Sequence, residues 1–93
     1  MAANLELYRI FYSVARAGSM TRASRELYIS QPAVTQSIKQ LEKELGGRLF
    51  VRGSRGITLT QEGELLLKYV ERALEQLNSG EKRFSEMLNL DRG

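Results

Sequence analysis

The stretch SQPAVTQS, residues 30–37, concentrates short side chains whose chemistry is hydrogen bonding. Its amides and hydroxyls include those of Gln31, Thr35 and Gln36, and none of them ionises near neutral pH. A glutamine amide offers a donor beside an acceptor, which matches the N6/N7 edge of adenine. The same residues could form an ordinary polar helix start, because Pro32 in a first turn forfeits only an N–H that has no partner there. The stretch alone leaves both interpretations open.

A second candidate group is the segment RGSRG at residues 52–56. Arg52 and Arg55 flank or occupy a loop bounded by glycines, and an arginine on such a loop can enter a narrow minor groove of DNA. Taken by itself, the segment is more often a solvated hairpin turn. Together, this loop and the amide-rich stretch indicate DNA binding more strongly than either feature does alone.

Residue types that are missing exclude several kinds of catalysis. The sequence of 93 residues has no histidine and no cysteine. It therefore cannot build a Ser–His triad, a Cys–His pair or a metal site with histidine or cysteine ligands. An oxygen-only metal site needs clustered carboxylates, whereas acids such as Glu42, Glu44, Glu71 and Glu75 are spread along predicted helices, which favours solvated helix faces. We expect no enzyme activity, no metal and no cofactor.

Charge is distributed unevenly along the chain. Residues 1–60 hold nine lysines and arginines against four acids, a net charge of +5, and residues 61–93 hold five against seven, a net charge of −2. A basic first part favours a polyanion as its partner. No apolar run approaches the roughly 20 residues of a membrane span, and no signal peptide is visible. With no cysteine, these features predict a cytoplasmic protein without a membrane partner.

Three amphipathic helices are predicted in the first half of the chain. Apolar residues recur at spacings of three and four over residues 5–17, 20–27 and about 31–45. The residues YIS at 28–30 form the turn between the second and third helices. The expected N-caps are Asn4, Ser19 and either Ser30 or Gln31. The third helix and the segment after it are expected to place in the core Val34, Ile38, Leu41, Leu45, Leu49 and Phe50.

The hydrophobic period changes after the two glycines at 46–47. RLFVR and ITLT are short β-prone runs around GSRG, which predicts a hairpin. A long helix is predicted from 61 to about 89, with Thr60 as its N-cap, and would be about 40 Å long. Its apolar residues follow a heptad seam that is too long to be buried on a head of about sixty residues, so much of it should meet a partner. The seam consists of Leu66, Val70, Ala73, Leu77, Gly80, Phe84 and Met87.

The order of these elements is that of a winged helix-turn-helix, a mainly α fold with three helices and a two-stranded β wing, here followed by a long dimerisation linker helix. The sequence also resembles the N-terminal DNA-binding domain and linker helix of LysR-type transcriptional regulators. The resemblance covers about residues 4–75 without gaps and includes F..V...GS.T.A...L..SQPAV, QLEKELG..LF.R and LT..G. It implies a winged helix-turn-helix domain at 3–60, with the helix-turn-helix at about 20–39 and the wing at about 49–60, and a linker helix at 61–90.

The resemblance also implies roles for individual residues. Residues implied to read bases in the major groove are Gln31, Pro32, Ala33, Thr35 and Gln36, and the wing residue implied to enter the minor groove is Arg55. Implied phosphate contacts are Ser19, Thr21, Ser30, Lys39 and Arg52. Implied dimerisation residues are Leu66, Val70, Ala73, Leu77 and Phe84. Because many family members have arginine where Gln36 stands, the operator sequence cannot be copied from relatives.

The implied partners are double-stranded DNA with an interrupted inverted-repeat operator and a second copy of the chain. The resemblance further implies a tetramer in the full-length protein, and a small-molecule effector that binds only through a C-terminal effector-binding domain. That domain is absent from this chain, which we expect to be an excised part of a bacterial regulator. The alternative is a winged-helix module for protein–protein interaction, which the heptad seam would serve equally well.

Overall fold

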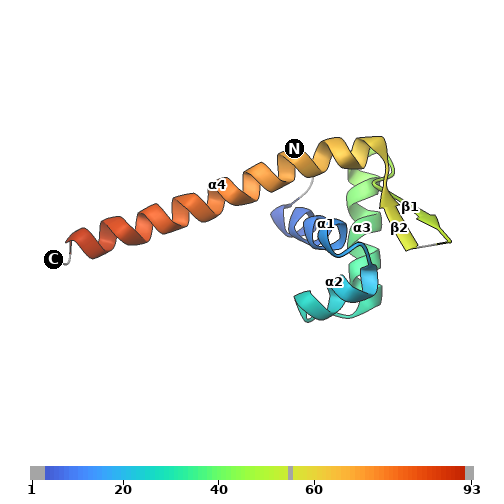
Figure 1. Ribbon diagram of the computed structural model, residues 1–93, viewed down its shortest axis with the longest axis horizontal. Helices are drawn as coiled ribbons and strands as arrows, with labels where there is room; N and C mark the ends of the chain where they lie inside the picture. Colours follow the sequence, from blue (N-terminus) through green and yellow to red (C-terminus); the bar gives the residue numbers. More distant parts are fainter. Residues whose placement is uncertain (1–3, 55, 92–93) are drawn as a thin grey trace.

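The computed structural model describes residues 4–54 and 56–91 of the chain (Figure 1). Three helices and a two-stranded hairpin form a head, and a long fourth helix projects from it. The elements in chain order are α1 (Leu5–Ala17), α2 (Met20–Leu27), α3 (Gln31–Leu45), β1 (Phe50–Gly53), β2 (Gly56–Leu59) and α4 (Gln61–Asp91). This is the winged helix-turn-helix with a long additional helix that the sequence predicts.

Each of the three head helices begins at a side-chain cap. The first-turn N–H groups of a helix have no partner within the helix, so an oxygen just before it stabilises the start. The caps are Asn4 Oδ1, which accepts from Leu7 N–H at 3.1 Å, Ser19 Oγ, which accepts from Arg22 N–H at 3.1 Å, and Ser30 Oγ, which accepts from Ala33 N–H at 3.2 Å. Of the two expected caps for α3, the structure therefore has Ser30, and Gln31 is the first helical residue.

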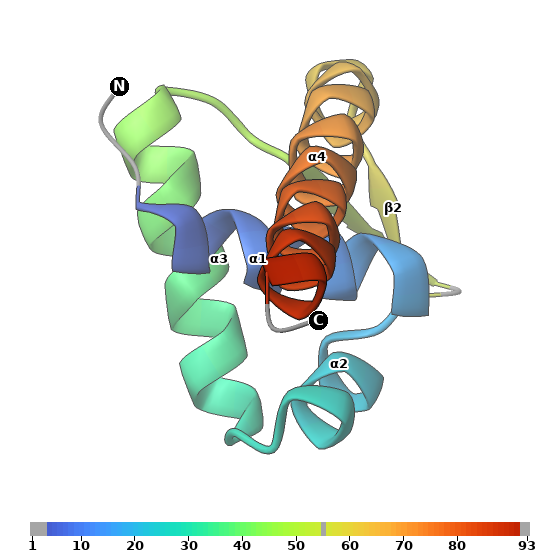
Figure 2. The same ribbon diagram turned by 90° about the vertical axis from the view of Figure 1, so that its left-hand side faces the viewer.

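The core lies where α1 packs between the other elements (Figure 2). One face of α1 is buried, as its spacing predicts, and it meets α2, α3 and α4. The rings of Phe11 and Phe50 are tilted against each other with their centroids 5.6 Å apart, which holds the start of the wing on α1. The largest side chains that are fully buried are Phe11, Ile38, Leu41, Val14 and Val34.

Two residues differ from their expected positions. Leu45 is 44% exposed, because it lies in the last turn of α3 beside Gly46 and Gly47, where the chain turns away from the core. Val70, which the heptad pattern assigned to the dimer seam, is 5% exposed and belongs to the core of the single chain. The reason is that α4 crosses α1 at this point, so the first turns of the seam face the head.

The wing is a short antiparallel hairpin in which Phe50 pairs with Leu59 and Gly53 with Gly56. Only Thr60 separates the end of β2 from the start of α4. The Thr60 hydroxyl accepts from Gly63 N–H at 2.9 Å, which caps α4 as expected. It also donates to the carbonyl of Arg48 at 2.7 Å, while Thr60 N–H donates to the carbonyl of Leu49 at 2.9 Å. These bonds join α4 directly to the segment that leads into the wing.

A glycine is required at position 63 because the junction has no room for a side chain, and not because of the backbone conformation. A Cβ added at Gly63 would lie far inside van der Waals contact of the Leu49 carbonyl oxygen, and also close to the Leu59 side chain. The glycine thus lets α4 pass against the main chain before β1.

The second half of α4 lies away from the head. Every residue from 75 to 90, a segment that we call the arm, is exposed, and the molecule measures 57 × 27 × 21 Å. The helix is continuous through Gly80. Among the described residues, no helix is both long and apolar enough to cross a membrane.

Replacing Gly63 with alanine should destabilise the head. The added methyl collides with main-chain atoms that cannot rotate away, so we expect the free energy of unfolding to fall by about 1–3 kcal/mol. Urea unfolding at one fixed protein concentration measures this. Gly47→Ala is the matched control, because nothing lies within 4 Å of a Cβ at Gly47; it should change the stability by less than about 0.5 kcal/mol. Equal stability of the two variants would contradict the close packing at Gly63.

Candidate nucleic-acid interface

The amide-rich stretch of the sequence forms the first two turns of α3. Pro32 and Gln36 are exposed there, one turn apart, and Gln31, Ala33 and Thr35 are half-buried beside them. The side chains are short, so the start of α3 is a slim surface with amide and hydroxyl groups and no charge. Such a surface can approach a polar edge closely, and it satisfies what a major groove requires of a helix that enters it.

The hydroxyls at the helix starts keep a donor for a ligand. Ser19 and Ser30 use their Oγ atoms to accept from their own helices, which leaves each O–H free to donate. Thr21 is exposed in the first turn of α2. Helix starts also carry partial positive charge, so these groups are suited to phosphate oxygens.

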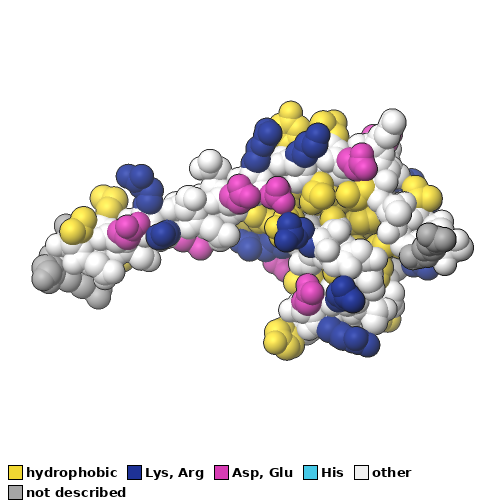
Figure 3. Space-filling model, in the orientation of Figure 1, with side chains coloured by type: hydrophobic (Ala, Val, Ile, Leu, Met, Phe, Trp, Pro, Cys, Tyr) yellow, Lys and Arg dark blue, Asp and Glu magenta, His cyan; other side chains and the backbone are white. Residues whose placement is uncertain are grey.

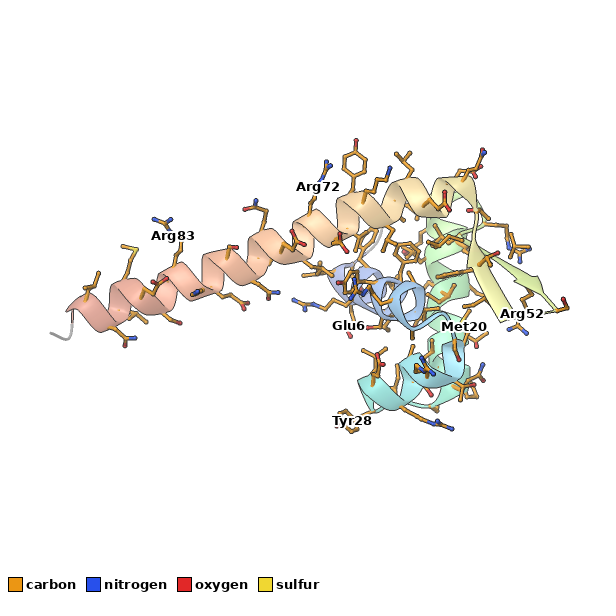
Figure 4. The ribbon with its side chains drawn as sticks, viewed as in Figure 1. Glu6, Met20, Tyr28, Arg52, Arg72 and Arg83 are labelled. Carbon is orange, nitrogen blue, oxygen red and sulfur yellow. The ribbon has the colours of Figure 1, made fainter. Side chains whose placement is uncertain are left out.

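A cleft separates α3 from the wing, and its two sides carry positive charge. Lys39 lies on the α3 side and Arg52 on the β1 side, and both are exposed. Figure 4 shows Arg52 on the wing, on the side of the head where Met20 lies. The sequence-predicted phosphate residues Lys39 and Arg52 are therefore brought together across one cleft. The cleft is lined by Met20, Thr35, Ile38, Lys39, Glu42, Arg48, Phe50, Arg52 and Ile57.

Arg55, the wing residue that the resemblance assigns to the minor groove, lies outside the described residues. Its described neighbours in sequence are Ser54 and Gly56, at the end of the hairpin that β1 and β2 form.

Glu42 is the residue whose role the sequence does not reveal. The sequence predicts it on a solvated helix face, but its side chain is only 16% exposed. One carboxylate oxygen accepts from Leu49 N–H at 2.7 Å and from Phe50 N–H at 3.4 Å, and the same oxygen lies 3.7 Å from Arg48 Nε. Glu42 therefore fixes where the wing begins relative to α3. The available signal was its position four residues after Ile38, at the edge of the buried stripe.

Arg48 is a second residue that the sequence analysis did not single out. Its side chain is 74% exposed, and it lines the cleft together with Lys39 and Arg52. Its ion pair with Glu42 is long, at 3.7 Å, and the Arg48 side chain is exposed to solvent, so the pair stabilises the fold little. A third cation at this cleft adds to the attraction for a polyanion.

The family of the chain follows from its match to a family model. The model for bacterial regulatory helix-turn-helix proteins of the lysR family matches residues 5–64, more than half of the chain. The chain belongs to the LysR family. The match includes the helix-turn-helix, both strands of the wing and the start of α4, and it confirms the resemblance seen in the sequence.

Individual LysR-family regulators are similar over most of this chain. It is 40% identical over 83 residues to the HTH-type transcriptional regulator GltR of Bacillus subtilis (strain 168), which covers 89% of this chain and 28% of GltR. It is 37% identical over 92 residues to the HTH-type transcriptional regulator CfxR of Cupriavidus necator, which covers 99% of this chain and 29% of CfxR. The chain thus spans less than a third of the length of these relatives.

Solved LysR-family structures confirm the fold. The structure of the BenM DNA-binding domain in a complex with catB site 1 DNA matches with a TM-score of 0.87 at 32% identity, over 91% of this chain and 96% of that chain. The complex of the CbnR DNA-binding domain with DNA matches with a TM-score of 0.82 at 34% identity, over 91% of this chain and 98% of that chain. The head and α4 together therefore have the winged-helix architecture of LysR-family DNA-binding domains.

Replacing Glu42 with alanine should loosen the wing without unfolding α3. Two main-chain N–H groups next to the core would lose their acceptor, so we expect a loss of about 1–3 kcal/mol in stability. Compared with the unaltered chain, the rate of amide hydrogen exchange should increase more at Leu49 and Phe50 than elsewhere in the head. Glu44→Ala is the control, since Glu44 is exposed on the same helix. Unchanged exchange at Leu49 in Glu42→Ala would rule out this role.

Proposed function

We propose that this chain is the DNA-binding part of a LysR-family transcriptional regulator, and that it recognises a specific sequence in double-stranded DNA. The observation that supports this most directly is the start of α3, where uncharged hydrogen-bonding side chains occupy a slim surface beside a cleft with cations on both sides. In this proposal α3 enters the major groove with its first two turns. The DNA complexes of similar LysR-family domains support the same partner. No catalytic group or cofactor is needed for this function, which would be exercised in the cytoplasm.

The proposal divides the interface into base contacts and backbone contacts. Bases are read by Gln31, Pro32, Ala33, Thr35 and Gln36, which carry no charge. Phosphates are bound by Ser19, Thr21, Ser30, Lys39 and Arg52, to which the structure adds Arg48. Contacts to phosphates give affinity that depends on salt, whereas contacts to base edges give discrimination between sequences. Arg55 would enter the flanking minor groove; this part rests on its position in the family pattern.

We further propose that two copies of the chain pair through α4. The large apolar residues of the arm are not buried within one chain: Leu77 is 41% exposed, Phe84 65% and Met87 66%. A helix that is exposed on all sides has little tertiary packing to stabilise it, so a partner that covers these residues would contribute to its stability. The proposed seam keeps Leu66, Ala73, Leu77 and Phe84 from the sequence prediction and leaves out Val70, because Val70 is buried in the core of one chain.

The position of a second apolar surface favours an antiparallel pair. An apolar groove lies between α1 and α4 on the head, lined by Leu5, Tyr8, Leu66, Tyr69, Val70, Ala73 and Leu74. Figure 3 shows hydrophobic side chains gathered where α4 meets the head, and others toward the end of the arm. If two copies of α4 cross near Leu77 in opposite directions, Phe84 of one copy meets the groove near Val70 of the other. A parallel pair would leave the groove empty and set the two basic heads side by side.

An antiparallel pair places two α3 helices on opposite sides of a two-fold axis. Such a dimer would read two half-sites of an interrupted inverted repeat. In a full-length regulator, the remaining length of the protein would bind the small-molecule effector and provide the contacts of a tetramer.

Base contacts and phosphate contacts should respond differently to mutation. We expect Gln36→Ala to weaken binding to the preferred site by about 1–3 kcal/mol and to change affinity for random DNA far less. We expect Lys39→Ala to weaken binding to both DNAs. We also expect the negative slope of log K against log salt to become shallower by about 0.9. Fluorescence titrations with both DNAs at several salt concentrations measure this. Equal losses on both DNAs for Gln36→Ala would argue against base reading, and no DNA binding even at low salt would favour a protein-interaction module.

Replacing Phe84 with lysine should separate the dimer. Phe84 lies on the arm, so the head should fold normally, but a charge would have to enter the apolar groove of the other copy. Sedimentation equilibrium should give a dimer for the unaltered chain and a monomer for Phe84→Lys. Ser79→Lys is the matched control, because it adds the same charge on the opposite side of the arm, and it should remain dimeric. A monomeric unaltered chain at high concentration would refute pairing through α4.

A further inference from the structure

Gly80 lies on the apolar seam of the arm, but nothing within one chain requires a glycine there. It stands in the interior of α4, where glycine weakens a helix more than any residue except proline. Its φ is not positive, and a Cβ added at Gly80 would have no heavy atom of another part of the chain within 4 Å. A close approach by a second molecule would explain why a side chain is missing at this position.

The surface of the arm has a hollow at Gly80. Leu77 lies one turn before Gly80 and Phe84 one turn after it, and both side chains are exposed. The hollow is lined by Gln76, Leu77, Gly80, Glu81, Phe84 and Ser85. One face of the helix therefore carries a protruding side chain, Leu77, three residues from a hollow. A two-fold axis that passes between Leu77 and Gly80 would place each Leu77 in the hollow of the other copy.

We propose that Leu77 of one copy fills the hollow at Gly80 of the other, and that Gly80 thereby sets the register of the antiparallel pair. This inference rests on the proposed pairing through α4. The seam residues of two antiparallel helices all lie opposite one another only in registers that differ by whole heptads. In the register proposed, Leu77 lies opposite Gly80, and Phe84 lies opposite Ala73. Large side chains thus face small ones, which lets the two helices pack closely.

The apolar groove on the head favours the same register. In this register Met87, which is exposed near the end of the arm, lies opposite Val70, and Val70 lines the groove. A shift by one heptad in one direction would carry Met87 past the groove to Gly63, which is buried. A shift in the other direction would set Met87 opposite Leu77 and leave most of the groove uncovered. The proposed register therefore covers the apolar end of the arm and the groove together (Figure 3).

Gly80→Leu tests the inference, because it fills the hollow. A two-fold pair would meet the added side chain twice, so we expect dimerisation to weaken at least roughly tenfold in sedimentation equilibrium. Leucine forms helices better than glycine, so this loss would not come from a weaker arm. Leu77→Ala should weaken the dimer of the unaltered chain but strengthen that of Gly80→Leu, since it makes room for the new leucine. Ser79→Leu is the matched control on the other side of the arm, and it should change the affinity by less than about twofold.

The outcomes separate this inference from the proposed pairing. If the unaltered chain is a dimer and Gly80→Leu dimerises equally well, the inference is overturned while pairing through α4 stands. If Leu77→Ala weakens Gly80→Leu further, a residue other than Leu77 faces Gly80, and the inference is again overturned. If the unaltered chain is a monomer at high concentration, the proposed pairing fails as well. Circular dichroism checks that each variant keeps its helices.

A distance measurement tests the register without changing the seam. The chain has no cysteine, so one introduced cysteine carries one spin label in each copy. Arg72→Cys and Ser85→Cys place labels at exposed positions that are equally far along α4 from the midpoint between Leu77 and Gly80. Both dimers should therefore give similar distances between labels, with a separation of about 20 Å along the helix axis. A register shifted by one heptad would lengthen one separation and shorten the other by about 10 Å, and a parallel pair would remove both; either result overturns the inference.

Discussion

Three elements of the head, α3, the wing and α4, are joined at the main chain of one residue, Leu49. Its N–H group is held by the Glu42 carboxylate from α3, and its carbonyl oxygen accepts from Thr60 N–H at the start of α4. Its side chain is buried. Because α3, the wing and α4 all meet here, a displacement of any one of them would strain hydrogen bonds to the other two. A head of this size has a small core, so such polar fastening matters for keeping a single arrangement.

The chemistry of the proposed interface follows from a separation of charged and uncharged groups. In the proposed complex, the side chains at the start of α3 would distinguish ligands by the pattern of donors and acceptors, and they can be short because the helix itself would bring them close. The cations lie at the cleft and the wing, where longer side chains reach outward. A lysine or arginine at these positions could read guanine, but it could also bind phosphates, which carry no sequence information. In the proposed complex, neutral first turns of α3 would therefore favour contacts to base edges over contacts to phosphates.

Local patterns in the sequence predict the elements well, because they depend on few neighbours. Helix bounds, the Ser19 cap and the hairpin follow from periodicity and from residues next to each break. The sequence does not reveal partners that are distant along the chain. Glu42 is predicted on a solvated helix face, yet the wing folds back onto it. Val70 fits a dimer seam, yet α1 covers it, while Leu45 fits the core stripe but lies past the elements that could bury it.

Because only Thr60 connects β2 to α4, a movement of the long helix should also move the head. With no flexible segment between β2 and α4, and with hydrogen bonds on both sides of the joint, a tilt of the helix would be transmitted to the wing and to α3 with little loss. In the proposed dimer, the rigid α4 helices would set the distance between the two heads. An operator whose half-sites lie at another spacing would then have to bend or twist to fit, and the stiffness of the intervening DNA would become part of the selection even though no side chain touches it.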